Sequence, residues 1–150
     1  MIEAAGTKPY GFMKFNPGLG VGGHCIPVDP TYLAAVAEEH GAPATFIRRA
    51  NEVNLEMSKY VVDRVAADNG GSLMGKSVLV VGVAYKPNVA DIRETPVEAL
   101  ISGLKKSGVV VSWHDDLVKN WNDESSVAMG SGFDLAILAT PHDYLDLSLN

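Results

Sequence analysis

The first half of the chain repeats apolar residues at helical spacing. Residues 46–68 place apolar side chains three or four positions apart and charged side chains on the other faces, so they predict a long helix. The run Asn69-Gly70-Gly71-Ser72 is typical of a helix end. The apolar face of this helix would be formed by Val53, Met57, Tyr60, Val61 and Val65.

A shorter helix is predicted just before the long one. Asp29 followed by Pro30 favours a helix start, because aspartate caps free N–H groups and proline suits the first helical position. Gly41 favours its end. Residues 1–28 show neither helical nor alternating spacing, so we expect them to be irregular. The apolar face of the short helix would be formed by Tyr32, Leu33, Val36 and Ala37.

The spacing changes in the second half of the chain. Ser77–Val83 is a continuous, largely β-branched run, typical of a strand buried on both faces. Residues 96–106 then predict a helix, with Thr95 as its N-cap, Glu98 completing a capping box and Gly108 at its end. Two more strands are predicted at Val109–Trp113 and Asp134–Thr140.

This order of elements predicts an α/β fold: a helical central segment followed by a small, open, Rossmann-like parallel sheet. We predict two units, residues 1–71 and residues 72–150. Only three strands are predicted, and the chain ends soon after the third one, at Leu147-Ser148-Leu149-Asn150. We therefore expect the second unit to be truncated at its C-terminus.

Composition narrows the classes of function. The 150 residues carry a net charge of −6, which gives no reason to expect a nucleic-acid or membrane partner. The single cysteine cannot form an internal disulfide, which favours a reducing, cytoplasmic location. The first ten residues lack the apolar core of a signal peptide, and apolar runs such as Val78–Val81 are too short to span a bilayer. The four histidines lack metal-ligand spacing, so we expect no metal.

That cysteine, Cys25, lies in a loop of unusual composition. Gly18, Gly20, Gly22 and Gly23 precede it, and Pro27 follows. A lone cysteine is often a buried packing residue, but a glycine-rich backbone can approach a ligand closely and offer N–H groups to a thiolate or an oxyanion. We therefore favour a nucleophile. The neighbouring His24 is not expected to be its base, because adjacent side chains of an extended loop point to opposite faces.

Two other positions allow two interpretations each. Asp29 is either a helix cap or a carboxylate that activates water, and the sequence leaves these even. Asp115, at the end of the second predicted strand, is either a ribose contact or a surface charge, and His142 ends the third strand at the same edge.

The turn after the first strand is a weak dinucleotide signal. It reads Gly82-Val83-Ala84-Tyr85-Lys86, with alanine and proline where the fingerprint has its later glycines. The loop continues through Lys86, Asn88, Asp91 and Arg93 to a capped helix. It is either an anion site at the helix N-terminus or a solvated charged loop.

Two segments closely resemble signatures of one enzyme family. Asn16-Pro-Gly-Leu-Gly-Val-Gly-Gly-His-Cys-Ile-Pro-Val-Asp29 resembles the active-site cysteine loop of the UDP-glucose/GDP-mannose dehydrogenase family. Gly82-Val-Ala-Tyr-Lys-Pro-Asn-Val-Ala-Asp-Ile-Arg-Glu-Thr-Pro96 resembles the second signature, in the family's C-terminal domain. The amino-acid sequence of these two segments is most similar to that of the branch that acts on UDP-N-acetylmannosamine or UDP-N-acetylglucosamine.

The resemblance implies a role for each matched residue. Such enzymes oxidise a sugar C6 alcohol to a carboxylate with two NAD⁺. Cys25 would capture the aldehyde as a thiohemiacetal, which is oxidised to a thioester, and Asp29 would help to activate water. Lys86 would lie near the diphosphate and Arg93 at the cofactor interface. Asn16 and the four glycines Gly18, Gly20, Gly22 and Gly23 would wrap the UDP-sugar substrate.

The resemblance also implies what lies outside the chain. The family's NAD-binding domain and a catalytic lysine and asparagine precede the matched segments, so we expect a C-terminal fragment that is inactive alone. The long helix matches the family's dimerisation helix, which implies a homodimer. Two alternatives stay open: a non-catalytic nucleotide-sugar-binding or dimerisation module, and an enzyme completed by a separate NAD-binding chain.

Overall fold

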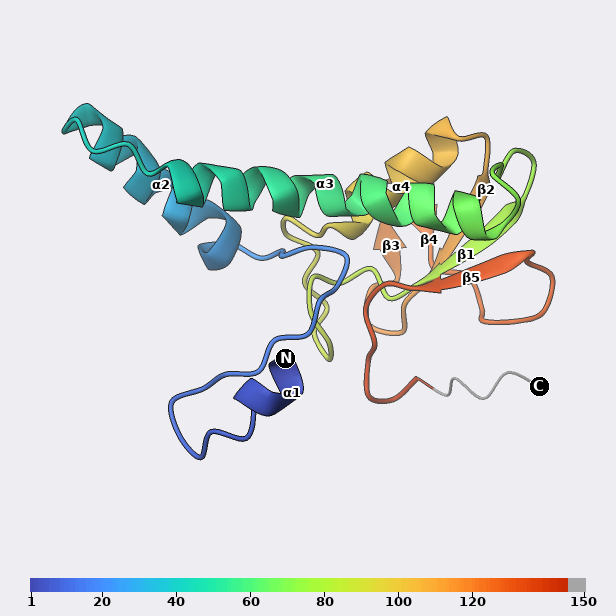
Figure 1. Ribbon diagram of the computed structural model, residues 1–150. Helices are drawn as coiled ribbons and strands as arrows, with labels where there is room; N and C mark the ends of the chain where they lie inside the picture. Colours follow the sequence, from blue (N-terminus) through green and yellow to red (C-terminus); the bar gives the residue numbers. More distant parts are fainter. Residues whose placement is uncertain (146–150) are drawn as a thin grey trace.

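Figure 1 shows the computed structural model of the chain, which describes residues 1–145. None of the helices in this range combines the length and apolar character needed to cross a bilayer. The helices are α1 (Ile2–Ala5), α2 (Cys25–Glu39), α3 (Thr45–Asp68) and α4 (Val97–Lys106), and the strands are β1 (Ser77–Val81), β2 (Val110–His114), β3 (Asn120–Trp121), β4 (Glu124–Ser125) and β5 (Leu135–Leu138).

The predicted α/β fold with a small parallel sheet is confirmed. The strand order is β2-β1-β5, and β1 pairs in parallel with both neighbours. Val80 at the centre of β1 lies opposite Trp113 on one side and Ile137 on the other. As the central strand, β1 is paired along both edges, and its residues Val78–Val81 are all buried.

The long α3 helix connects the two parts of the molecule (Figure 1). Near its start it packs on α2, where the amide of Asn51 donates to the Thr31 hydroxyl at 2.9 Å. Its later turns pack on α4, where the Ser58 hydroxyl donates to the carbonyl of Pro96 at 3.1 Å. Val62 joins the core that α4 forms with the sheet: Val78, Val80, Val97, Leu100, Leu104 and Trp113.

A division into residues 1–71 and 72–150 therefore stays a prediction, since the later turns of α3 share a core with the second unit. The expected truncation concerns residues 146–150, which lie outside the described residues.

Three helix ends follow the sequence prediction. At each of them a glycine adopts positive φ, and the next residue donates its N–H to a carbonyl five residues earlier. These bonds are Ala42 to Ala37, Gly71 to Ala66 and Val109 to Leu104, at 2.8, 2.8 and 3.2 Å.

Helix starts were less well predicted. The helix α2 begins at Cys25, with His24 as its N-cap, so the expectation that Asp29 caps it is wrong. The N–H groups of the first helical turn have no partner within the helix, so Pro27, which lacks an N–H, fits there. Pro30 lies one turn later, where its missing N–H removes one hydrogen bond of the helix. The capping box at α4 is only half formed. The Thr95 hydroxyl accepts the N–H of Val97 at 3.4 Å while donating to the Val83 carbonyl at 2.9 Å, but the N–H of Thr95 donates to the Ile92 carbonyl and not to Glu98.

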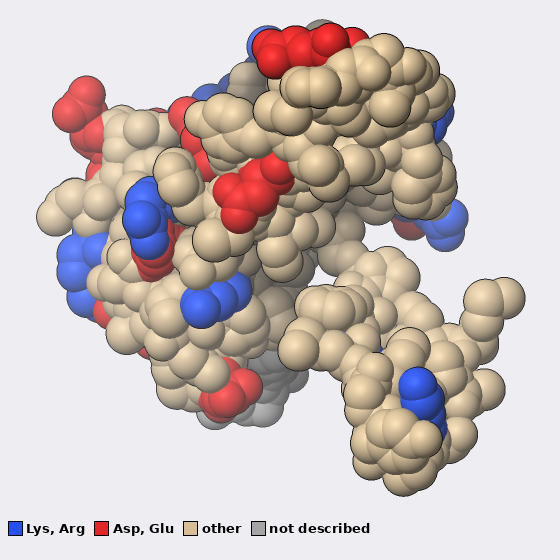
Figure 2. All heavy atoms as spheres, turned by 90° about the vertical axis from the view of Figure 1, so that its left-hand side faces the viewer, with Lys and Arg blue, Asp and Glu red and all other residues tan. Residues whose placement is uncertain are grey.

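Short elements were missed altogether. The four-residue α1 lies in a segment expected to be irregular, and the β3–β4 pair consists of two-residue strands. The α1 helix and the loop that follows it lie apart from the other helices and the sheet (Figure 1) and form a separate lobe in Figure 2. Several of their aromatic and methionine side chains are exposed: Tyr10, Phe12, Met13 and Phe15.

Candidate active site

The glycine-rich segment lies between α3 and the loop that leads to α4. On one side, the backbone N–H of Val21 donates to Oδ1 of Asn54 on α3 at 2.9 Å. On the other side, the N–H of Gly23 donates to the carbonyl of Arg93 at 3.1 Å. Two sequence-distant elements therefore fix the segment just before Cys25.

Contact with this loop is too close for side chains at two of the four glycines. A Cβ atom on Gly22 would lie 2.6 Å from the carbonyl oxygen of Glu94, and one on Gly23 would lie 2.8 Å from the ring of Tyr85. Gly20 is tight against Pro96, at 3.1 Å, whereas a Cβ on Gly18 would meet nothing within 4 Å. The glycine pair permits the backbone of the segment to pack directly on the second signature loop.

A groove of about 970 Å³ opens along this contact. Of the residues predicted to bind substrate, it brings together Asn16, Gly18, Gly20, Gly22 and Lys86. Apolar side chains of α3 and the ring of Tyr85 complete it, and Nζ of Lys86 lies 5.4 Å from the centre of that ring. The arrangement provides one cation in a largely apolar cleft, which suits a ligand with a flat ring and an anionic group.

Cys25 lies at the edge of this groove. It is exposed, and its neighbours Gly22 and Ile26 line the groove, whereas Gly23 and Cys25 themselves lie just outside. As the first residue of α2, Cys25 is next to backbone N–H groups that have no partner within the helix. The positive end of the helix dipole favours an anion at this place.

Asp29 also belongs to α2, four residues after Cys25. Side chains at this spacing lie on the same face of a helix, roughly 5–6 Å apart at their Cβ atoms. Asp29 is exposed. The carboxylate and the thiol thus lie side by side at the start of α2, an arrangement that the expected cap at Asp29 did not anticipate.

Arg93 lies near this thiol but is engaged with Asp91. Its guanidinium donates from Nε and from Nη2 to the carboxylate of Asp91, at 3.0 and 2.6 Å. The hydrogen bonds from Arg93 lower the pKa of Asp91 to about 2. Asp91 in turn raises the pKa of Arg93, with smaller contributions from Tyr85 and Cys25. Arg93 therefore orders its own loop beside Cys25, while Lys86 alone of the two reaches the groove.

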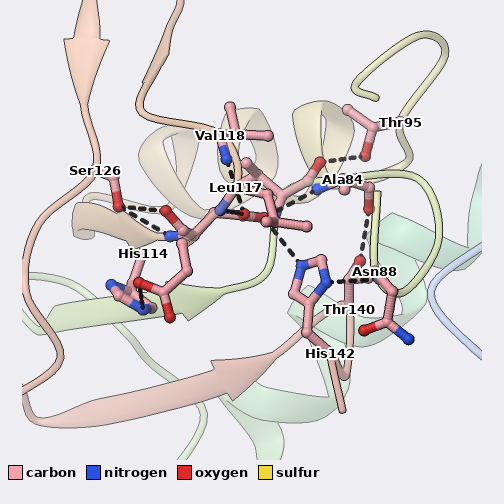
Figure 3. Close-up of polar contacts among 12 residues, drawn as sticks. Ala84, Asn88, Thr95, His114, Leu117, Val118, Ser126, Thr140 and His142 are labelled. Carbon is pink, nitrogen blue, oxygen red and sulfur yellow. Dashed lines mark hydrogen bonds and ion pairs between the residues drawn. The ribbon is translucent and has the colours of Figure 1, made fainter. Parts of the chain in front are cut away.

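Asp115 is neither a ribose contact nor a surface charge, so both interpretations of it were wrong. Its side chain is fully buried and accepts the N–H groups of Val83, Leu117 and Val118 at 2.9, 2.9 and 3.0 Å (Figure 3). Burial alone raises the pKa of the carboxyl, but these bonds and one from His142 outweigh it and hold the pKa below its usual range.

Two groups in the site were missed by the sequence interpretation. Asn54 occupies an ordinary helical position without any motif, so no local signal marked it as the anchor of Val21. Tyr85 belongs to the second signature, but the resemblance implies no role for it. Among residues 1–145 the structure shows no cluster of three or more side chains that could hold a metal ion.

Comparisons with known proteins match both halves of the chain to one family. Residues 1–56 match the family model described as "UDP-glucose/GDP-mannose dehydrogenase family, central domain", and residues 79–148 match its "UDP binding domain". Protein CapL of Staphylococcus aureus is 35% identical over 97% of this chain and 37% of its own length. A UDP-N-acetyl-D-mannosamine dehydrogenase of Methanococcus maripaludis is 36% identical over 85% of this chain and 30% of its own length.

A solved structure of a related protein has the same fold over most of this chain. A UDP-glucose dehydrogenase from Pyrobaculum islandicum superimposes with a TM-score of 0.81 at 28% identity, covering 93% of this chain and 34% of that one. The chain thus spans about a third of the length of the relatives it matches.

Proposed function

The chain belongs to the UDP-glucose/GDP-mannose dehydrogenase family, and we propose that it is part of an NAD-dependent UDP-sugar 6-dehydrogenase. The substrate would be a UDP-N-acetylhexosamine, oxidised at C6 from the alcohol to the carboxylate. One observation carries the proposal: the exposed Cys25 stands at a helix N-terminus, at the edge of a groove that contains Lys86.

Cys25 supplies the covalent chemistry in this proposal. Its thiol adds to the C6 aldehyde, the sulfur forming a bond to carbon while the carbonyl oxygen takes up a proton, which gives a thiohemiacetal. After the second oxidation, the acyl group is held as a thioester. Asp29, on the same face of α2, accepts a proton from the water that attacks the thioester, and hydrolysis releases the uronate and restores the thiol.

Lys86 and the glycine segment would bind the nucleotide. The ammonium group of Lys86 is placed to pair with the diphosphate, and Asn16, Gly18, Gly20 and Gly22 line the wall against which the sugar would lie. Gly23 would act indirectly, by joining this wall to Arg93. A role for Arg93 at the cofactor interface remains a prediction.

NAD does not fit the turn after β1 in this chain. The amides of Val83 and Ala84, which would face a pyrophosphate there, donate instead to Asp115, at 2.9 and 3.4 Å. We therefore propose that the NAD-binding part belongs to polypeptide outside residues 1–150, in a longer protein or in a partner chain. Residues 1–150 alone are then expected not to reduce NAD⁺ with UDP-sugars, and measurable turnover would contradict this.

Alkylation of the single cysteine tests the proposal directly. We expect iodoacetamide to label Cys25 rapidly and UDP-N-acetylglucosamine or UDP-N-acetylmannosamine to slow the labelling, whereas ADP-glucose does not. Lys86→Ala should keep the rapid labelling and lose the protection, because it removes the proposed phosphate contact and leaves Cys25 in place.

Mass spectrometry of the labelled peptide gives the rate, and Cys25→Ser serves as the unlabelled control. Slow labelling that ignores every nucleotide sugar would contradict the catalytic assignment. It would favour the other candidate, a non-catalytic binding or dimerisation module.

A further inference from the structure

A buried histidine connects the core to the loop that carries Lys86. Nδ1 of His142 accepts the backbone N–H of Asn88 at 2.9 Å, so the proton of the neutral ring lies on Nε2. That nitrogen lies 3.1 Å from Oδ2 of Asp115 (Figure 3). A proton on Nδ1 would oppose the N–H of Asn88, so only this tautomer keeps both bonds.

Asn88 is the point at which the loop is held. Its backbone has a φ of 64°, an uncommon conformation that asparagine tolerates better than most residues. Its side-chain amide donates to the carboxylate of Asp143 at 2.8 Å, and its side-chain oxygen accepts the N–H of Asp143 at 3.1 Å. Three hydrogen bonds therefore join this exposed residue to the turn after β5.

The same loop forms one wall of the groove. It closes on itself where the N–H of Tyr85 donates to the carbonyl of Asp91 at 2.9 Å. Tyr85, Lys86 and Pro87 line the groove, and Asn88 follows directly. The attachment at Asn88 thus fixes the position from which Lys86 reaches the groove.

We propose that His142 is a positioning residue for the UDP-sugar site, acting through Asn88 on the loop that presents Lys86. This inference rests on the proposed function. Asp115 has N–H donors from the backbone without His142, so the carboxylate stays satisfied when the imidazole is replaced. The bond to Asn88, by contrast, has no substitute among the described contacts of that N–H group.

Two substitutions separate the two bonds of the imidazole. His142→Asn puts an amide oxygen near the place of Nδ1, so it can accept the N–H of Asn88 but cannot reach Asp115. His142→Gln reaches Asp115 with its amide and leaves Asn88 without an acceptor. Both remove the ring and should lose similar thermal stability, which makes each the control for the other.

We expect the affinity of residues 1–150 for UDP, measured by calorimetry, to fall when the hydrogen bond to Asn88 is lost and to persist when it is kept. The affinity of His142→Gln should fall about tenfold, as expected for the loss of one positioning hydrogen bond, while His142→Asn stays within about twofold of the original chain. Equal losses in both variants, or none in either, would overturn the positioning role and leave His142 a packing residue.

Hydrogen exchange of the Asn88 amide, followed by NMR, gives a second readout that needs no ligand. It should accelerate in His142→Gln and remain slow in His142→Asn. If the original chain binds no UDP, the proposed function fails, yet this exchange still decides whether His142 holds the loop. Unchanged exchange in His142→Gln would show that it does not.

Discussion

At the scale of single residues, the backbone of Gly22 lies so close to the loop before α4 that no side chain fits between them. Gly22→Ala would force a Cβ to within 2.6 Å of the Glu94 carbonyl, so this variant should lose about 1–3 kcal/mol of unfolding free energy, as overpacked sites do. Thermal unfolding measures the loss.

Gly18→Ala is the matched control for this prediction. It lies in the same segment, its added Cβ meets nothing within 4 Å, and its change should stay within about 0.5 kcal/mol. Equal destabilisation of the two variants would mean that the backbone of Gly22 does not pack on the loop before α4.

The carboxyl of Asp91 offers a prediction about pH. Its pKa is lowered to about 2 by Arg93, so its interaction with Arg93 contributes stability above the ordinary pKa near 3.8, and this is lost as the pH falls through about 2. Carboxyl ¹³C NMR titration follows the group directly. Arg93→Ala should return the pKa towards 3.8, whereas Lys86→Ala should move it much less; similar shifts in both variants would contradict this order of causes.

The sequence predicts residues whose role depends on a local pattern, and it fails for residues whose role depends on distant partners. The glycine-rich composition around Cys25 is enough to predict a ligand-binding loop there. The role of Asp115 depends on amides contributed by the turn after β1, 31–32 residues away, and that of Asn54 on a loop 33 residues earlier. No local spacing encodes such partners.

At the scale of elements, helix ends were predicted better than helix starts for the same reason. A glycine that ends a helix does so through its own backbone, as at Gly41, Gly70 and Gly108. The start of α2 lies directly after the tertiary contact that holds Gly23 against Arg93. Asp29-Pro30 is a plausible local start, but it lies five residues too late.

The packing of α3 on α4 should depend on Val62. This side chain is 6% exposed and belongs to the main core, so Val62→Ala should cost about 2 kcal/mol of unfolding free energy. Val53→Ala, the same change at a position of α3 that is 43% exposed, should cost less than half as much. Denaturant unfolding compares the two, and equal costs would refute the docking of α3 in this core.

At the scale of the whole molecule, the helical part exposes a large apolar surface. Figure 2 views the end of the molecule where α2 lies and shows broad areas without charged side chains. Large patches of this kind mark interaction surfaces. The exposed side chains on α2 and α3 include Tyr32, Leu33, Val36, Phe46 and Leu55.

We expect residues 1–150 to form a homodimer through this surface. Sedimentation should give a dimer for the original chain and a monomer for the double variant Tyr32→Glu, Leu33→Glu, because two buried charges would oppose association. Val110→Glu, an equally exposed apolar position on β2, should leave the dimer intact. A monomeric original chain would contradict the prediction.

The attachment of α3 to the hydrophobic core has a mechanical consequence. The helix is about 36 Å long, and its later turns pack in the core. Its middle forms a wall of the groove, at Val53, Asn54 and Met57. A slight tilt of the helix at its later turns becomes a larger displacement at its middle and start, and it moves the α2 helix and the Val21 segment that are attached there. Repacking the interior around Leu100 and Leu104 would thereby widen or narrow a cleft that neither residue touches.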